Sequence, residues 1–280
     1  MAKRTYFEAL KWASLFIQAR GLDESAAQYL MLGLSNLDQT HLLLNYRQPM
    51  PAALQDAYEN AIYQYGEGVP PQYLLGKASF YGREFVVNSS VLIPRQETEE
   101  LVDWVLTTCT DSGLNVLDVG TGSGAIGLTL KAQRPDWQVT LSDLSLAALE
   151  VARTNASQLA LAVQFAEGDL LTPLKGQPID VIVSNPPYIA QSERVDMDQA
   201  VLKSEPQMAL FADHDGLAIY ERLAAQLKVG FLSPKHLFLE FGFKQRAALT
   251  ALFTATFPTA KVESRQDIAG HDRMLHVQFE

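Results

Sequence analysis

Residues 115–124, NVLDVGTGSG, decide the fold of this chain. The run begins with mostly apolar side chains, which are typical of a buried strand. Its glycines let the backbone turn tightly and approach a ligand closely where a strand passes into a helix. Asp143 ends the next apolar run, where a carboxylate would bond the ribose hydroxyls of a nucleotide cofactor. This pattern predicts a strand, a turn and a helix that together hold such a cofactor.

Strands and helices alternate along the rest of this region. The predicted strands are apolar and lie at 115–120, 138–143, 163–169, 180–184 and 236–241. The predicted helices between them lie at 125–134, 145–159, 217–229 and 244–256. This rhythm implies a parallel sheet covered by helices on both faces. Two further strands, near 261–264 and at 273–280, have no helix between them and are expected to be antiparallel neighbours. We predict a seven-stranded, doubly wound α/β sheet.

The first 75 residues have a different pattern. Apolar residues recur at helical spacing, Asp38 is placed to cap a short helix, and Pro51 suits the first turn of another. Residues 76–94 contain a hairpin-like segment. We therefore expect a small helical bundle domain at 1–75, a β-hairpin linker at 76–94 and the α/β domain at 95–280.

The composition limits the classes of function. The chain has 280 residues, a formal net charge of −10 and a sequence pI of about 5.0, and such acidity opposes wholesale binding to a phosphate backbone. Its single cysteine cannot form an internal disulfide, and the N-terminus has no apolar signal core. No apolar run approaches the length of a membrane span, and the histidines show no metal-ligand spacing. We expect a cytoplasmic protein without a metal site.

The glycine turn alone leaves two cofactor classes open. Residues 120–125 also satisfy the dinucleotide pattern G-x-G-x-x-[G/A], so a nicotinamide dehydrogenase competes. Asp118 favours S-adenosylmethionine, because a carboxylate two residues before the first glycine suits an ammonium and a sulfonium and would repel a pyrophosphate. Asp169, followed by Leu170, is a candidate for the adenine edge, although a helix cap or turn explains an acid there equally well.

A second motif, Asn185-Pro186-Pro187-Tyr188, directly follows a buried strand. An amide nitrogen is a poor nucleophile because its lone pair is delocalised into the carbonyl. The Asn185 side-chain oxygen and the Pro186 carbonyl are two acceptors that can bind the two amide hydrogens, and the prolines restrict the backbone that carries them. Tyr188 offers a flat face for stacking. The motif therefore predicts methyl transfer to a planar amino group, with a simple proline turn as the structural alternative.

The ordered set formed by residues 118–124, Asp143 and residues 185–188 resembles the class I, S-adenosylmethionine-dependent methyltransferases that modify exocyclic or amide nitrogens. Further segments resemble the bacterial peptide chain release factor glutamine methyltransferases, and these lie at 71–76, 80–82, 91–95, 97–99, 205–206, 209–210 and 267–270. With the N-terminal helices, the resemblance covers nearly the whole chain. It implies the Rossmann-like methyltransferase sheet for 95–280 and substrate recognition by the helical domain.

That family methylates the side-chain N5 of the glutamine in the Gly-Gly-Gln motif of class-1 release factors. The resemblance implies a site for S-adenosylmethionine made of Asp118, Gly120, Thr121, Gly122, Ser123, Gly124, Asp143, Asp169, Leu170 and Asn185. It implies that Asn185, Pro186 and Tyr188 are catalytic and that the substrate also contacts Pro187, Arg95 and Glu97. The family commonly has a proline where this chain has Gln96, which loosens the expected rigidity of that loop.

Other substrates and roles stay open. A sister family methylates a glutamine of a ribosomal protein and shares the corner motif, but the acidic segment 97–99 favours the release-factor branch. A nucleic-acid adenine N6 or cytosine N4 methyltransferase would need to flip its base and hold phosphates, which the net charge of −10 opposes. A non-enzymatic adaptor that binds the cofactor is a third possibility. We expect a monomer that acts on release factors, with no membrane and no nucleic acid as partner.

Overall fold

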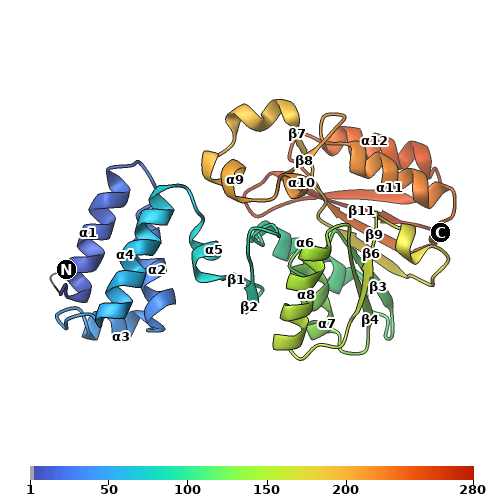
Figure 1. Ribbon diagram of the computed structural model, residues 1–280. Helices are drawn as coiled ribbons and strands as arrows, with labels where there is room; N and C mark the ends of the chain where they lie inside the picture. The colour runs from blue at the N-terminus through green and yellow to red at the C-terminus, as the bar shows by residue number, and fades with distance from the viewer. Residues whose placement is uncertain (1–2) are drawn as a thin grey trace. The chain divides into compact units, whose positions relative to one another are not determined.

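The computed structural model describes residues 3–280, which form two compact units (Figure 1). One unit runs to Lys77 and includes Met197–Ser204, and the other comprises Ala78–Asp196 and Glu205–Glu280. The segment Met197–Ser204 thus belongs with the helices, although it lies within the predicted α/β range 95–280. Each unit has a buried apolar core of its own.

The first unit is a bundle of helices. They are α1 (Tyr6–Gln18), α2 (Ser25–Ser35), α3 (Gln39–Leu44), α4 (Ala52–Gly66), α5 (Pro71–Leu75) and α9 (Gln199–Ser204). Helix α1 starts at a capping box in which Thr5 and Glu8 exchange side-chain and backbone hydrogen bonds. Asp38 caps α3 as predicted, by accepting a backbone hydrogen bond at 2.7 Å. The buried Tyr58 hydroxyl donates to the Ala27 carbonyl at 3.0 Å and ties α4 to α2.

The second unit is built on a seven-stranded sheet with the order β10-β11-β9-β6-β3-β4-β5. Its strands are β3 (Asn115–Val119), β4 (Gln138–Asp143), β5 (Gln164–Glu167), β6 (Val181–Ser184), β9 (His236–Glu240), β10 (Lys261–Gln266) and β11 (Asp272–Gln278). The strands from β9 to β5 are parallel, whereas β11 is antiparallel to both β9 and β10. The predicted doubly wound sheet and its antiparallel final pair are confirmed.

Both faces of the sheet are apolar, because successive strand residues point to opposite sides. Val116 and Val181 belong to the core on one side, whereas Leu117 and Ile182 belong to the core on the other. The covering helices are α6 (Glu97–Thr108), α7 (Ala125–Gln133) and α8 (Leu146–Gln158) on the first side, and α11 (Ala218–Lys228) and α12 (Arg246–Thr256) on the second (Figure 1). The strand order reverses between β3 and β6, and in such sheets ligands bind beyond the carboxyl ends of the strands at this point.

Short elements complete the second unit. They are the hairpin strands β1 (Lys77–Phe80) and β2 (Arg83–Val86), the pair β7 (Ile189–Ala190) and β8 (Phe211–Ala212), helix α10 (Gln207–Leu210), and the 3-10 turns η1 (Thr172–Leu174) and η2 (Gln191–Asp196). Between residues 3 and 280, no helix combines the length and the apolar character that crossing a membrane requires.

Candidate active site

An open pocket of about 210 Å³ lies at the carboxyl ends of β3, β4, β5 and β6. Its wall contains residues 120–123 of the glycine loop, Asp143, residues 168–170 after β5 and residues 184–187 after β6. Thr98 lines it from α6. The structure thus brings the glycine loop and the Asn-Pro-Pro corner, which are far apart in the sequence, into one pocket at the switch point of the sheet.

The backbone of the glycine loop explains why it contains glycine. Gly120, Gly122 and Gly124 have φ angles of 68°, 55° and 84°, a region that side chains with a Cβ rarely adopt. The Gly122 amide donates to Asp143 Oδ2 at 2.9 Å, and the Thr121 amide donates to a β4 carbonyl at 2.9 Å. The loop is therefore fixed to β4, and its residues form one side of the pocket.

Asp118 lies beneath this loop and is fully buried, so its side chain is not part of the pocket wall. Its Oδ2 accepts hydrogen bonds from the Thr121 hydroxyl at 2.6 Å and the Gly127 amide at 2.9 Å. Its Oδ1 has no hydrogen-bond partner among residues 3–280. Burial raises the pKa of Asp118 to about 6, against the lowering effect of the two hydrogen bonds. A cation bound near the loop would stabilise this buried carboxylate.

Asp143 and Asp169 follow successive strands and both line the pocket. Asp143 Oδ1 accepts from the Ser145 amide at 2.9 Å, and burial raises the pKa of its carboxyl group. Asp169 forms an ion pair with Arg222 of α11, which also lines the pocket. Leu170 lies beside Asp169 in the wall. The residues expected at the adenine edge are thus at the pocket, together with an arginine that the sequence did not indicate.

The Asn-Pro-Pro corner is held at the end of β6. The Ser184 hydroxyl donates to the Val119 carbonyl at 2.7 Å and joins the end of β6 to the end of β3. Asn185 Nδ2 donates to Thr98 Oγ1 at 3.2 Å, whereas Asn185 Oδ1 is buried without a hydrogen-bond partner in the described chain. Pro186 follows in the pocket wall. The corner therefore places one acceptor oxygen without a partner in the described chain, Asn185 Oδ1, at the pocket.

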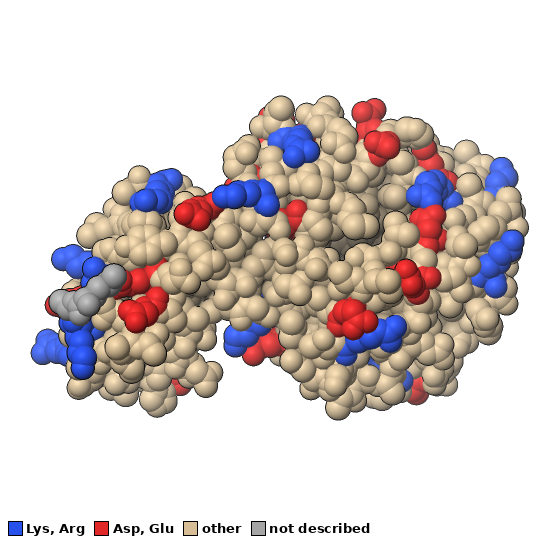
Figure 2. Space-filling view, viewed as in Figure 1, with Lys and Arg blue, Asp and Glu red and all other residues tan. Residues whose placement is uncertain are grey.

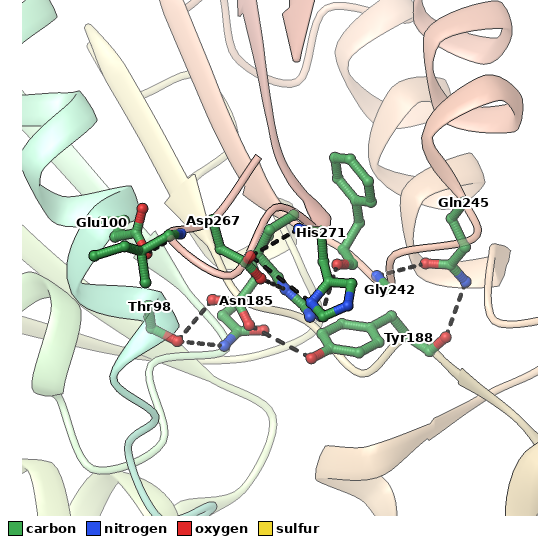
Figure 3. Close-up of polar contacts among 12 residues, drawn as sticks. Thr98, Glu100, Asn185, Tyr188, Gly242, Gln245, Asp267 and His271 are labelled. Atoms are coloured by element: carbon green, nitrogen blue, oxygen red, sulfur yellow. Dashed lines mark hydrogen bonds and ion pairs between the residues drawn. The ribbon is translucent and has the colours of Figure 1, made fainter. Parts of the chain in front are cut away.

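Tyr188 is not among the residues that line this pocket. Its ring packs against the core under α11 and α12, and its hydroxyl lies 3.5 Å from Glu240 Oε1. Figure 3 shows the Tyr188 ring beside Asn185. Gln245 Nε2 donates to the Tyr188 carbonyl at 2.9 Å, and a Cβ on Gly216 would lie 2.0 Å from the same oxygen. Burial, followed by the charge of Glu240, raises the pKa of Tyr188. In this structure Tyr188 anchors the corner to its surroundings.

The two expected substrate residues near α6 differ in position. Arg95 lines the pocket, and its Nη2 forms a 2.6 Å ion pair with the buried Glu205. Burial raises the pKa of Glu205, and Arg95 opposes that rise. Glu97 is not in the pocket wall, and the nearby Glu99 accepts from the Tyr81 amide of the hairpin at 2.8 Å.

Asn155 of α8 is a structural residue of the site that sequence reasoning missed. It is 1% exposed, and its carboxamide exchanges two hydrogen bonds with the Val86 backbone, at 2.6 and 3.0 Å. The same amide donates to the Ser123 carbonyl at 2.8 Å. Asn155 therefore ties the hairpin to the glycine loop. An asparagine within a helix gives no signal of this, because its partners lie 69 and 32 residues away.

The pocket fits S-adenosylmethionine better than a dinucleotide. Asp118 and Asn185 each have a buried acceptor oxygen without a partner in the described chain, and Asp143 stands where ribose hydroxyls would bind. Both arginines in the wall, Arg95 and Arg222, are already paired with carboxylates rather than free for a pyrophosphate. Across residues 3–280, no group of three or more His, Cys, Asp or Glu side chains could hold a metal ion.

Known proteins share this architecture and sequence. The family model for the methyltransferase small domain matches residues 98–210, and the model for the PrmC N-terminal domain matches residues 8–76. The chain is 42% identical to the release factor glutamine methyltransferase of Enterococcus faecalis over 98% of this chain and 99% of that protein. It is 41% identical to that of Bacillus subtilis over 97% of both. The hMettl16 catalytic domain, 14% identical, shares the fold with a TM-score of 0.57 over 78% of this chain and 92% of its own. The resemblance drawn from the sequence is confirmed: this chain belongs to the release factor glutamine methyltransferase family.

Proposed function

We propose that this protein transfers a methyl group from S-adenosylmethionine to the side-chain N5 of the glutamine in the Gly-Gly-Gln motif of class-1 release factors. The observation that carries the proposal is Asn185 Oδ1, a buried acceptor without a partner among residues 3–280, at the edge of a pocket that fits the cofactor. The relatives named release factor glutamine methyltransferase support the choice of substrate.

The corner would act by positioning. Asn185 Oδ1 and the Pro186 carbonyl would each accept one hydrogen of the glutamine amide, so that the nitrogen lone pair faces the methyl donor. S-adenosylmethionine, when bound, supplies an electrophilic methyl group on its sulfonium. Acceptors fixed before the substrate arrives lower the barrier through orientation and electrostatics. The methylated nitrogen is strongly acidic and loses its proton to water, so no resident base is needed.

The cofactor would be held by the glycine loop and the strand ends. We assign to it Asp118, Gly120, Thr121, Gly122, Ser123, Gly124, Asp143, Asp169, Leu170 and Asn185. Asp118 would stabilise the cationic methionine end from beneath the loop, and Asp143 would bond the ribose hydroxyls. Burial raises the pKa of Asp118, so a bound cation would relieve its unfavourable negative charge. Burial also raises the pKa of Asp143, and hydrogen bonds from the ribose hydroxyls would stabilise that carboxylate.

The protein substrate would enter beside Arg95. We assign Arg95 and Pro187, which line the pocket, to the substrate side. Glu97 and Tyr188, which do not line it, would support this side from behind. We propose that the helical domain at 1–75, together with Met197–Ser204, recognises the release factor, with 76–94 as linker and the rest of 95–280 as the methyltransferase domain. On the face drawn in Figure 2, the visible Lys and Arg side chains are interspersed with Asp and Glu. With the net charge of −10, this supports a protein rather than a nucleic-acid substrate. We propose a monomer that acts in the cytoplasm.

Labelled cofactor and a purified class-1 release factor test the proposal. Label is expected on the Gly-Gly-Gln glutamine and should disappear when that glutamine is replaced by alanine. Asn185→Ala should lower kcat by about 10²- to 10³-fold, the range seen when one preorganised polar group is removed from an active site. The matched control is Gln158→Ala on the exposed end of α8, which should leave kcat unchanged. Labelling of a ribosomal protein alone would overturn the assignment.

A further inference from the structure

We propose that Thr98 and Glu240 form a positioning pair that fixes which end of the Asn185 carboxamide faces the substrate. The inference rests on the proposed function and deepens it. Asn185 can accept an amide hydrogen only with its oxygen, so a carboxamide turned by half a rotation would present an NH₂ group and repel the glutamine amide. Thr98 and Glu240 are not catalytic residues in this scheme, because they act through Asn185.

Three elements bring the groups together. Thr98 lies in the first turn of α6 and is buried, Asn185 directly follows β6, and Glu240 ends β9. Since β6 and β9 are adjacent parallel strands, their carboxyl ends meet at the same edge of the sheet. Asn185 Nδ2 lies 3.2 Å from Thr98 Oγ1 (Figure 3). Thr98 Oγ1 in turn lies 2.6 Å from Glu240 Oε2. The three side chains form one continuous chain of hydrogen bonds.

The donors and acceptors available on the three side chains determine which way each of these hydrogen bonds points. An ionised carboxylate only accepts hydrogen bonds, so the single Thr98 proton must point to Glu240. The Thr98 oxygen then has lone pairs alone to offer, and it can bind only the NH₂ end of Asn185. The Asn185 oxygen is thereby turned to the opposite side, where it has no partner among residues 3–280. Asn185 also forms a direct side-chain hydrogen bond with Glu240, to which it can only donate. The buried carboxylate thus determines the orientation of the amide both through Thr98 and directly.

The same reasoning predicts that the orientation of the Asn185 amide depends on pH. A protonated Glu240 can itself donate to Thr98, and the Thr98 proton is then free to point at Asn185, which favours the reversed amide. Burial raises the pKa of Glu240 to about 7, against the lowering effects of Thr98, Arg273 and Asn185. The titratable or charged groups that face it are Glu97 on α6, Tyr188 after β6, Tyr220 on α11 and Arg273 on β11. Orientation is therefore expected to be lost as the pH falls through about 7.

Substitutions at Thr98 test the pair directly. Thr98→Val keeps the shape of the side chain but removes the hydroxyl, and kcat for release factor is expected to fall by about 10- to 100-fold, the effect of losing one hydrogen bond to a charged group. Thr98→Ser restores the hydroxyl and should recover kcat to within about threefold of wild type. Urea unfolding of both variants shows whether the fold survives. Equal kcat for Thr98→Val and Thr98→Ser would overturn the proposal.

Glu240→Gln supplies a second test that does not depend on Thr98. With cofactor and release factor saturating, wild-type kcat should decline below about pH 7, whereas the variant should show a lower and flat profile between about pH 6 and pH 8. The combined loss of kcat in the Thr98→Val, Glu240→Gln double variant should be smaller than the product of the two single fold-losses, because both changes act on the orientation of Asn185. A wild-type decline retained in Glu240→Gln, or fully additive losses, would overturn the pair while leaving the proposed function intact. Wild-type protein that fails to label the release factor at all would overturn both.

Discussion

Replacing the buried Asp118 by asparagine is expected to preserve or increase the stability of the free protein while weakening cofactor binding. Asp118 is fully buried under the glycine loop, and its Oδ1 has no hydrogen-bond partner in the described chain. Burying an incompletely bonded charge is unfavourable. A bound cationic cofactor would compensate for this charge. Removing the carboxylate should therefore stabilise the free protein but weaken cofactor binding.

The expected change in the free energy of unfolding follows from the pKa of Asp118. Burial moves the pKa of Asp118 from its ordinary 3.8 to about 6, so ionisation in the folded state costs about 3 kcal/mol at neutral pH. The folded protein binds a proton at Asp118 more tightly than the unfolded chain does. The stability that this protonation contributes is therefore lost as the pH rises through about 6. In the variant, a buried Nδ2 without a partner costs about 1–3 kcal/mol. At about pH 7.5, Asp118→Asn should be as stable as wild type or up to about 2 kcal/mol more stable.

Urea unfolding of both proteins at about pH 4.5 and about pH 7.5 measures this effect. The free energy of unfolding of the variant, minus that of wild type, should increase by about 2 kcal/mol between the two conditions. The other titrating groups are common to both proteins and largely cancel. Calorimetric titration should show S-adenosylmethionine bound at least about tenfold more weakly by the variant. A stability difference that is constant with pH, or unchanged cofactor affinity, would refute the reasoning.

Two further substitutions test the supports of the pocket. Gly216→Ala should lower kcat by about tenfold or more, because its Cβ would lie 2.0 Å from the Tyr188 carbonyl and must displace the corner. The control Gly230→Ala has a similarly positive φ but no atom within 4 Å of its Cβ, and it should leave kcat unchanged. Asn155→Ala should lower the free energy of unfolding in urea by about 2–4 kcal/mol, because it leaves three buried or half-buried backbone groups of Val86 and Ser123 unpaired. The exposed Gln158→Ala on the same helix should change it by less than about 0.5 kcal/mol, and equal effects of these two would contradict the role of Asn155.

The fold was predictable from the sequence because its signals are local. Residues 115–124 carry their own strand, turn and helix start, and most of the apolar runs of the sheet are followed by a helical run. The antiparallel final pair was predictable for the same reason, since the missing helix is visible in the sequence. The membership of Met197–Ser204 in the helical unit was not, because it depends on contacts with residues more than 100 positions away, such as the 2.7 Å bond from Lys203 Nζ to the Glu67 carbonyl.

The two motifs of the site could be predicted from the sequence, but the residues that hold them in position could not. The glycine loop and the corner are contiguous in sequence, and the parallel sheet brings them to one edge. Thr98 and Glu240 are separated by 142 residues, and their pairing depends on the packing of α6 against β9. Neither residue stands in a pattern that indicates its neighbour. The position of Asp118 beneath the loop, rather than in the pocket wall, likewise depends on the packing of α7 against β3.

The place of β6 in the middle of the sheet has a consequence for exchange of backbone hydrogens. Strands inside a sheet open only when most of the domain opens, whereas edges and loops fluctuate readily. The amides of Val181–Ser184, which have β3 on one side and β9 on the other, should therefore be among the slowest to exchange with deuterated water. The corner therefore begins at one of the most stable backbone positions of the sheet, so its first residue is held in place in the folded protein before a ligand binds.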